Sequence, residues 1–262
     1  MKFIHLTDTH VVGGGAMLAG LDPVVRLRGA VASINAEHGD ADFVIVTGDL
    51  TDTGEAGAYE AFLSEIAALS MPVHLMVGNH DDTGVLAATY PSLMRDGAGF
   101  AQGAFETDQG RVLMLDTRVP GSDAGAYCEA RRAWLQEKLT RDDAPLFLFM
   151  HHPPMKIGIA SMDGIMLAEA EAFFDLLAPH VGRIRHLFFG HVHRPVWGTW
   201  RGIPFSAMRG LNHQVALVLD GPVDEFTGNA EPPAYGVVLV SGDQVTVHMH
   251  DYTSGEAGFD LP

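Results

Sequence analysis

Side chains that can bind a metal ion occur in five short motifs of this sequence. The motifs are DTH with Asp8 and His10, GDLTD with Asp49 and Asp52, GNHDD with Asn79, His80, Asp81 and Asp82, HHPP with His151 and His152, and GHVH with His191 and His193. Carboxylate oxygens and imidazole nitrogens suit divalent ions such as zinc, manganese, iron or cobalt. No motif contains cysteine, which argues against a thiolate-bound structural zinc. The donors are too many for one ion, so they indicate chemistry assisted by more than one metal.

Two of these motifs, DTH and GHVH, place a pair of potential ligands one residue apart. In extended backbone, residues at i and i+2 point to the same side. We therefore expect each pair either to bind one metal ion or to flank two.

Each motif lies at the end of an apolar segment that we expect to be a strand. The strands predicted from these segments are residues 3–8, 42–49, 72–79, 111–117, 145–152 and 186–191. Helical patterns lie between them at 22–39, 55–69, 129–139 and 166–178. This alternation predicts an α/β fold, in which the carboxyl ends of the strands bring their loops into one crevice. The five motifs should therefore meet.

The pattern changes after His193. Residues 195–208 indicate a hairpin that turns at Arg201 and Gly202, and residues 235–252 indicate another that turns at SGD. We expect one domain spanning 1–262, with antiparallel hairpins from about residue 195 onward packed on the core.

The overall charge limits the partners of the protein. A formal net charge of −17 repels DNA and RNA, and the sequence has no block of Lys and Arg, so we expect no nucleic acid polymer as a partner. The single Cys128 and the absence of a signal-peptide pattern predict a cytoplasmic protein. The apolar runs are shorter than the roughly 20 residues of a membrane-spanning helix, so no span is expected.

In their order and wording, the five motifs resemble those of the calcineurin-like metallophosphoesterases. GDLTD, GNHDD and HHPP are most similar to class III cyclic nucleotide phosphodiesterases and bacterial glycerophosphodiesterases, and the resemblance covers residues 3 to about 215. It implies a four-layer α/β/β/α sandwich of two mixed sheets flanked by helices. It also implies hydrolysis of a small phosphodiester, either a cyclic nucleotide or a glycerophosphodiester.

The same resemblance implies a role for individual residues. One divalent ion (Fe, Mn, Co or Zn) would be bound by Asp8, His10, Asp49 and His193, and a second by Asn79, His151, His191 and the shared Asp49. His80 would act on the substrate, with Asp81 orienting it, and Asn79 and His213 would also approach the substrate. A hydroxide bridging the two ions would attack the phosphorus in line.

Two other functions stay open at this stage. A phosphomonoesterase would need extra positive charge, for which Arg118, Lys156 and Arg194 are candidates. A catalytically silent scaffold of the same fold would be expected to lack ligands, whereas here every ligand position is filled.

The substrate pocket and the assembly are less defined by the sequence. Phe100, Tyr127, Trp197 and Trp200 are aromatic candidates for contact with a base or a choline-like head. Loops 11–22 and 155–166 flank the ligands and are candidates for the pocket walls. Because relatives often assemble, we expect a homo-oligomer, a dimer or larger, with the C-terminal hairpins or segment 221–236 at the interface.

Overall fold

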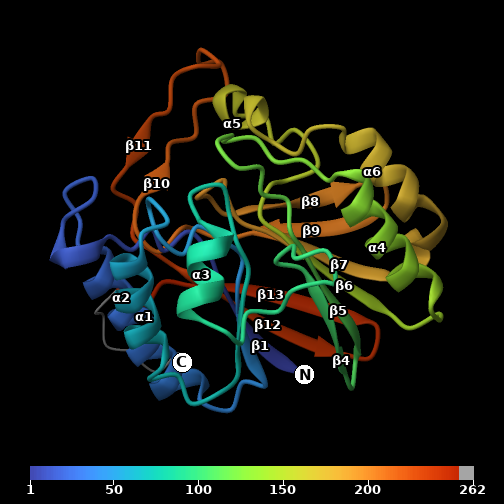
Figure 1. Ribbon diagram of the computed structural model, residues 1–262, viewed down its shortest axis with the longest axis horizontal. Coiled ribbons are helices and arrows are strands. Elements are labelled where there is room, and N and C mark those ends of the chain that lie inside the picture. The colour runs from blue at the N-terminus through green and yellow to red at the C-terminus, as the bar shows by residue number, and fades with distance from the viewer. Residues whose placement is uncertain (254–262) are drawn as a thin grey trace, which may run out of the picture.

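The computed structural model describes residues 1–253, in which two mixed β-sheets pack face to face (Figure 1). The first sheet has the order β13 (Gln244–His250), β12 (Tyr235–Ser241), β1 (Lys2–Leu6), β2 (Phe43–Val46) and β3 (Val73–Leu75). The second has the order β4 (Gly103–Thr107), β5 (Gly110–Leu115), β6 (Leu146–Met150), β7 (Ile184–Phe189), β9 (Ile203–Ala207) and β8 (Val196–Trp200). A short separate pair is formed by β10 (Gln214–Val215) and β11 (Gly228–Asn229).

Helices cover the outer face of each sheet, so the four-layer prediction is confirmed. The first sheet is covered by α1 (Pro23–His38), α2 (Ala56–Ile66) and α3 (Thr83–Thr89), and the second by α4 (Glu129–Thr140), α5 (Ala160–Gly164) and α6 (Ala170–Leu177). Short 3-10 turns are η1 (Gly13–Gly15) and η2 (Ala178–Arg183). None of the helices within residues 1–253 combines the length and hydrophobicity needed to cross a lipid bilayer.

Alternation along the strands produces three apolar layers. In β6, Leu146, Leu148 and Met150 face the helices of the second sheet, whereas Phe147 and Phe149 face the first sheet. Both faces of β6 are buried, which explains why its sequence is a continuous apolar run instead of an alternating one. β1 behaves in the same way, with Ile4 and Leu6 toward the helices and Phe3 between the sheets.

The strand directions bring the carboxyl ends together. Strands β1, β2 and β3 are parallel, and so are β5, β6, β7 and β9. Each parallel set therefore ends along one edge of its own sheet, and the two edges lie side by side because the sheets pack face to face.

All six strands expected from the sequence are present, and all but β7 are shorter than the apolar segments that predicted them. The predicted hairpins exist as β8–β9 and β12–β13. They extend the two sheets, because β12 pairs with β1 and β9 pairs with β7. Each hairpin thereby provides hydrogen-bond partners for the backbone N–H and C=O groups along the free edge of a central strand.

The layer between the sheets depends on a cluster of phenylalanines. The Phe3 ring stacks on Phe43 at a centroid distance of 4.9 Å and meets the edges of Phe149 and Phe188 at 5.7 and 5.5 Å.

We expect Phe3→Ala to lower the free energy of unfolding by about 3–5 kcal/mol, because the vacated space is closed on both sides by sheets. Urea denaturation measures the loss. Leu239→Ala, on the neighbouring strand but 41% exposed, should cost less than about 1 kcal/mol; an equal loss for both variants would contradict the prediction.

Candidate metal centre

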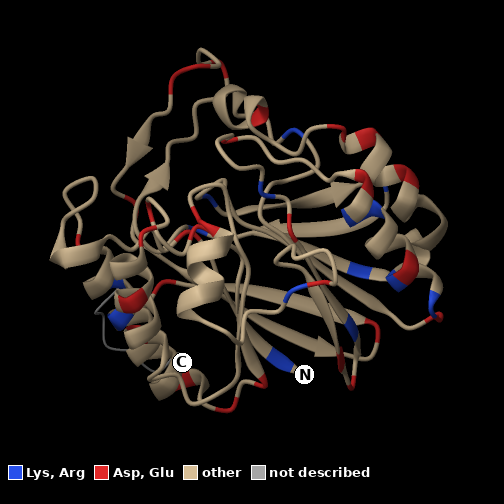
Figure 2. Cartoon of the chain, viewed as in Figure 1, with Lys and Arg blue, Asp and Glu red and all other residues tan. Residues whose placement is uncertain are grey.

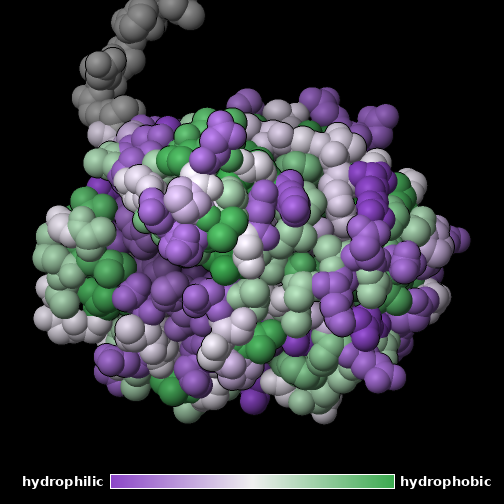
Figure 3. Space-filling view, turned by 90° about the horizontal axis from the view of Figure 1, so that it is seen from above, coloured by the Kyte–Doolittle hydropathy of each residue, from purple (hydrophilic) through white to green (hydrophobic). Residues whose placement is uncertain are grey.

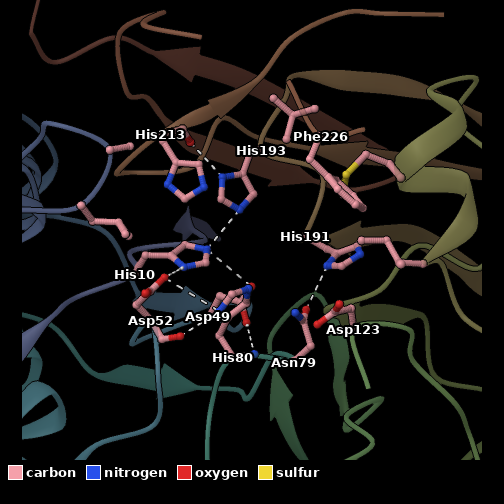
Figure 4. Close-up of a pocket in the computed structure, with 15 residues that line it drawn as sticks. His10, Asp49, Asp52, Asn79, His80, Asp123, His191, His193, His213 and Phe226 are labelled. Atoms are coloured by element: carbon pink, nitrogen blue, oxygen red, sulfur yellow. Dashed lines mark hydrogen bonds and ion pairs between the residues drawn. The ribbon is translucent and has the colours of Figure 1, made fainter. Parts of the chain in front are cut away.

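The carboxyl ends of the parallel strands bring the five motifs to one place (Figure 4). The polar residues that follow these strands are Asp8 and His10 after β1, Asp49 and Asp52 after β2, Asn79 and His80 after β3, His151 after β6, His191 and His193 after β7, and His213 beyond β9. All six strands that supply them belong to parallel pairs, three strands in each of the two sheets. The site therefore exists only where the sheets meet.

One group of donors contains Asp8, His10, Asp49 and His193, whose ligand atoms all lie within 4.8 Å of one another. The Nε2 atoms of His10 and His193 are 3.1 Å apart. His10 Nε2 is also 3.5 Å from Asp49 Oδ2, and His193 Nε2 is 3.4 Å from Asp8 Oδ1. All four side chains are buried, so no bulk water separates these donors.

A second group surrounds the amide oxygen of Asn79. Asn79 Oδ1 lies 3.1 Å from His151 Nε2 and 3.0 Å from His191 Nδ1. His151 Nε2 is 3.2 Å from Asp49 Oδ2, so Asp49 belongs to both groups. The resemblance implied these two sets, and the structure brings the members of each together.

The opposite nitrogen of three of these histidines is fixed by an acceptor. The Nδ1 atoms of His10, His151 and His193 lie 3.1, 2.7 and 2.8 Å from the Asp52 carboxylate, the Thr47 carbonyl and the His213 carbonyl. A neutral imidazole that donates from Nδ1 has a free lone pair on Nε2, which points to the centre. This tautomer is the one that binds a metal, so the residues fit a divalent cation.

The backbone at the motifs is not extended, and this corrects our explanation of the DTH and GHVH pairs. Asp8, His10, Asp49, His191 and His193 have φ values of 53°, 44°, 48°, 68° and 47°. Each left-handed residue costs about 1–2 kcal/mol relative to an ordinary conformation. Tight left-handed turns, instead of strand alternation, direct these side chains inward. In the GHVH motif, the two histidines enter different donor groups.

Burial and charge act against each other within the centre. Burial alone would lower the pKa of His151, but the Asp49 and Asp8 carboxylates raise it to about 9. Burial and the charge of His151 lower the pKa of His191 to about 3. The buried carboxylates thus hold positive charge in the centre, which is the electrostatic role that a metal ion would take over.

His80 and Asp81 do not form the pair that we expected. His80 has a side chain that is 39% exposed, and its Nδ1 lies 2.8 Å from the carbonyl oxygen of Asp52. The Asp81 carboxylate is buried and accepts hydrogen bonds from the amides of Leu50, Thr51 and Gly78 and from the Tyr59 hydroxyl. Asp81 therefore joins the loops that carry Asp49 and Asn79, and the loop of Asp52 positions His80.

The remaining histidines of the motifs have separate surroundings. His213 is half-buried, with its ring centroid 4.9 Å from that of His10 and 4.5 Å from that of His193. His152 is buried; its two ring nitrogens lie 2.7 Å from the Thr117 hydroxyl and 3.1 Å from the Asp123 carbonyl. His213 is thus placed at the open side of the first donor group, whereas His152 supports the loops behind the second.

A cavity of about 400 Å³ opens over the two donor groups, and a hydrophilic hollow flanked by apolar surface is visible from above (Figure 3). Loops 11–22 and 155–166 form part of its walls, as predicted, through Leu18, Ala19, Met162 and Ile165. The apolar lining also includes Val215 and Phe226, and Asp123 adds a carboxylate.

The aromatic lining residue was not found from the sequence. Phe100, Tyr127, Trp197 and Trp200 are not among the residues that line the cavity, and Phe226 is. Phe226 belongs to segment 221–236, which carries no strand or helix pattern and is placed at the cavity by the short β10–β11 pair. No sequence signal distinguished it.

No lysine or arginine lines this cavity among the described residues, and Lys and Arg are scattered over the remaining surface (Figure 2). Arg194 bonds to the Val215 carbonyl and to Glu231, and Arg118 lies 4.0 Å from Asp82. Lys156 is exposed outside the cavity. The three candidate cations for a phosphomonoesterase thus lie outside the lining of the cavity.

The sequence of this chain is similar to a family model and to several named proteins. Residues 1–195 match the model of the calcineurin-like phosphoesterase family. A probable cyclic nucleotide phosphodiesterase of Rhodopseudomonas palustris is 45% identical over 95% of this chain and 92% of its own length. A probable glycerophosphodiester phosphodiesterase of Arcobacter nitrofigilis is 31% identical over 84% and 81%, and the 3',5'-cyclic adenosine monophosphate phosphodiesterase of Escherichia coli is 30% identical over 77% and 73%.

The fold is also found in a solved structure. A purple acid phosphatase from yellow lupin seeds superimposes with a TM-score of 0.70 at 13% identity, over 98% of this chain and 52% of that one. This chain thus spans about half of the phosphatase, and the likeness concerns the fold.

An α/β/β/α sandwich with histidine and carboxylate donors at the meeting edges of its sheets defines the metallophosphoesterase class. The family match and the relatives together place the chain within it: it belongs to the calcineurin-like phosphoesterase family. The family and the His/Asp cluster indicate divalent metal ions as cofactors.

The carboxylate behind His10 should control metal affinity. Because Asp52 fixes the His10 ring through Nδ1, we expect Asp52→Asn to weaken metal binding about 10–100-fold. Isothermal titration calorimetry with Mn²⁺ on chelator-treated protein measures this change. Asp22→Asn, which replaces one good helix cap with another at the start of α1, is the control and should leave affinity unchanged. Equal affinities for Asp52→Asn and wild type would refute a positioning role for Asp52.

Proposed function

We propose that this protein is a dinuclear-metal phosphodiesterase that hydrolyses cyclic nucleotides. The observation that carries the proposal is the position of Asp49, whose carboxylate belongs to two adjacent donor groups. A carboxylate shared by two cations screens their repulsion, and a pair of ions about 3.5–4 Å apart is the arrangement used for in-line phosphoryl displacement. We propose that the described residues 1–253 form a single domain around this centre; residues 254–262 of the expected domain lie outside the described part of the chain.

The first ion would be held by Asp8, His10, Asp49 and His193, and the second by Asn79, His151, His191 and Asp49. Nitrogen and oxygen donors of this kind accept iron, manganese, cobalt or zinc, and the supply of metal in the cell would decide among them. When bound, the two ions would lower the pKa of water and polarise the phosphoryl oxygens.

His80 is proposed as the acid that protonates the leaving alkoxide. Its side chain lines the cavity, and the Asp52 carbonyl holds it through Nδ1, so its Nε2 is free for the substrate. The backbone amide of His80 donates to Asp49 Oδ1 at 2.9 Å, which ties its position to the shared ligand. An imidazole at this place can also stabilise the developing negative charge. We assign Asn79 and His213 to contacts with the phosphoryl group.

The lining of the cavity supports a nucleotide as substrate. Figure 4 shows Phe226 on the opposite side of the cavity from Asp52 and His80. With Met162 and Ile165 it forms an apolar wall above a polar floor of histidines. A phosphate on the floor would place a flat base against this wall, where an aromatic contact is favourable.

A glycerophosphodiester is the second candidate, and one observation favours it. Asp123 and Phe226 both line the cavity, and a carboxylate and an aromatic ring in one pocket suit a choline-like cation. The phosphomonoesterase alternative is weaker, because the dianion of a monoester would meet no lysine or arginine among the residues that line the cavity. A cytoplasmic location and a homo-oligomeric state stay predictions.

Metal-dependent hydrolysis of an aryl diester tests the activity. Protein stripped of metal and reloaded with Mn²⁺ should hydrolyse bis(4-nitrophenyl) phosphate much faster than 4-nitrophenyl phosphate. With cyclic AMP, whose leaving alkoxide needs a proton, His80→Ala should lower kcat about 100-fold or more with unchanged metal content by elemental analysis, because proton transfer contributes that much. His74→Ala, which changes a histidine stacked on Phe105, is the control and should keep activity. Inactivity of fully loaded wild type would instead favour a silent scaffold.

The apolar wall should select the substrate. We expect Phe226→Ala to raise KM for cyclic AMP about 3–10-fold through the lost aromatic contact, with little change for glycerophosphoethanolamine. Steady-state kinetics with both substrates measure the difference. Val223→Ala, in the same segment and 68% exposed, is the matched control. If Phe226→Ala affected only the glycerophosphodiester, the base would not lie on this wall and the second candidate would be favoured.

A further inference from the structure

A second cluster of metal-ligating side chains lies apart from the catalytic centre. Glu37 and His38 end helix α1, and His250 ends strand β13, more than 200 positions later in the chain. One ligand atom from each of the three lies within 4.8 Å of the other two. None of the three lines the cavity or belongs to either donor group at the strand ends.

The carboxylate of Glu37 is positioned before any ion binds. Its Oε1 accepts a hydrogen bond of 2.8 Å from the Ser33 hydroxyl, and Ser33 is itself 2.8 Å from the hydroxyl of Tyr235. Its Oε2 lies 3.3 Å from His250 Nε2. One oxygen is therefore anchored and the other faces the imidazole, an arrangement found where outer contacts orient a metal ligand.

The two imidazoles are held by the buried ring of Tyr235. The Tyr235 ring centroid lies 5.9 Å from that of His38 and 5.0 Å from that of His250, and the two imidazole centroids are 5.4 Å apart. Because these contacts already fix both rings, the side chains would lose little further conformational entropy when an ion binds.

One ring nitrogen of His38 lacks a hydrogen-bond partner. Its Nε2 is buried and has no hydrogen-bond partner among the described residues. Lys2 does not compete for Glu37, because its ammonium is paired with Asp40 at 2.6 Å.

We propose that Glu37, His38 and His250 form a second metal site, for Zn²⁺ or a cation of similar preference, that fastens strand β13 to helix α1. Two imidazoles and one carboxylate are a common zinc donor set, with water completing the coordination. Among residues 1–253, β13 is the edge strand of the first sheet and pairs only with β12, so an ion here would join that edge to the helical layer. The site is independent of the proposed phosphodiesterase activity.

Zinc stoichiometry tests the proposal. Full-length wild type, His250→Ala and His248→Ala are stripped with chelator, dialysed against Zn²⁺ and analysed for bound metal. His250→Ala should bind one equivalent fewer than wild type, whereas His248→Ala should match it, because His248 lies on the same strand outside the cluster. An unchanged equivalent in His250→Ala would overturn the proposal and leave the cluster as a Glu37–His250 ion pair.

A measurement without the catalytic centre separates the two sites. In protein with His10→Ala, His151→Ala, His191→Ala and His193→Ala, none of the candidate groups of the centre keeps three ligands. In this protein, Zn²⁺ in large excess should raise Tm by about 5 °C, because an ion that binds only the folded state stabilises it. Adding His250→Ala, or His38→Gln as a variant of similar size, should abolish the shift. A shift that survives both changes would also overturn the proposal. His250→Ala alone should hydrolyse the aryl diester at the wild-type rate. A failure of the zinc-site proposal can therefore be distinguished from a failure of the proposed phosphodiesterase function.

Discussion

The contact between Asp49 and His151 is the constraint on which this centre depends. Asp49 follows β2 in the first sheet and His151 follows β6 in the second, and their Oδ2 and Nε2 atoms are 3.2 Å apart. Residues of two separate sheets can be held at this distance only if the sheets do not slide. The phenylalanines between β1, β2, β6 and β7 prevent such sliding, because stacked and edge-to-face rings fill the interior at close packing.

The loops at the sheet edges then convert this rigid frame into converging ligands. Five ligand residues adopt left-handed backbone conformations, which the fold maintains at a cost in free energy. Gly78 permits the approach, because a Cβ there would overlap the Asp49 carboxylate. The buried Asp81 carboxylate compensates part of the cost by accepting three backbone amides from both loops. Burial and the Asp49 charge raise the pKa of Asp81 to about 6.

The cavity combines two surfaces with different functions. Its floor is made of donors from strand ends, which the fold fixes closely, and its apolar wall is made of loop residues such as Met162 and Phe226. Strand-end residues determine the reaction in such folds, whereas loops determine which substrate enters. This division agrees with the names of the relatives, which specify two kinds of phosphodiester.

The sequence by itself determined the α/β class, the six central strands and the set of donor residues, because apolar runs and ligand motifs are local patterns. It also indicated the loops that carry Leu18 and Met162 as walls. Tertiary structure alone decided that Asp81 ties two loops together, that Asp52 holds both His10 and His80, and that Phe226 reaches the cavity. It also brought His38 to His250 across the chain. The physical reason is that each of these contacts joins distant segments whose relative positions come from packing of the sheets, and local periodicity carries no information about it.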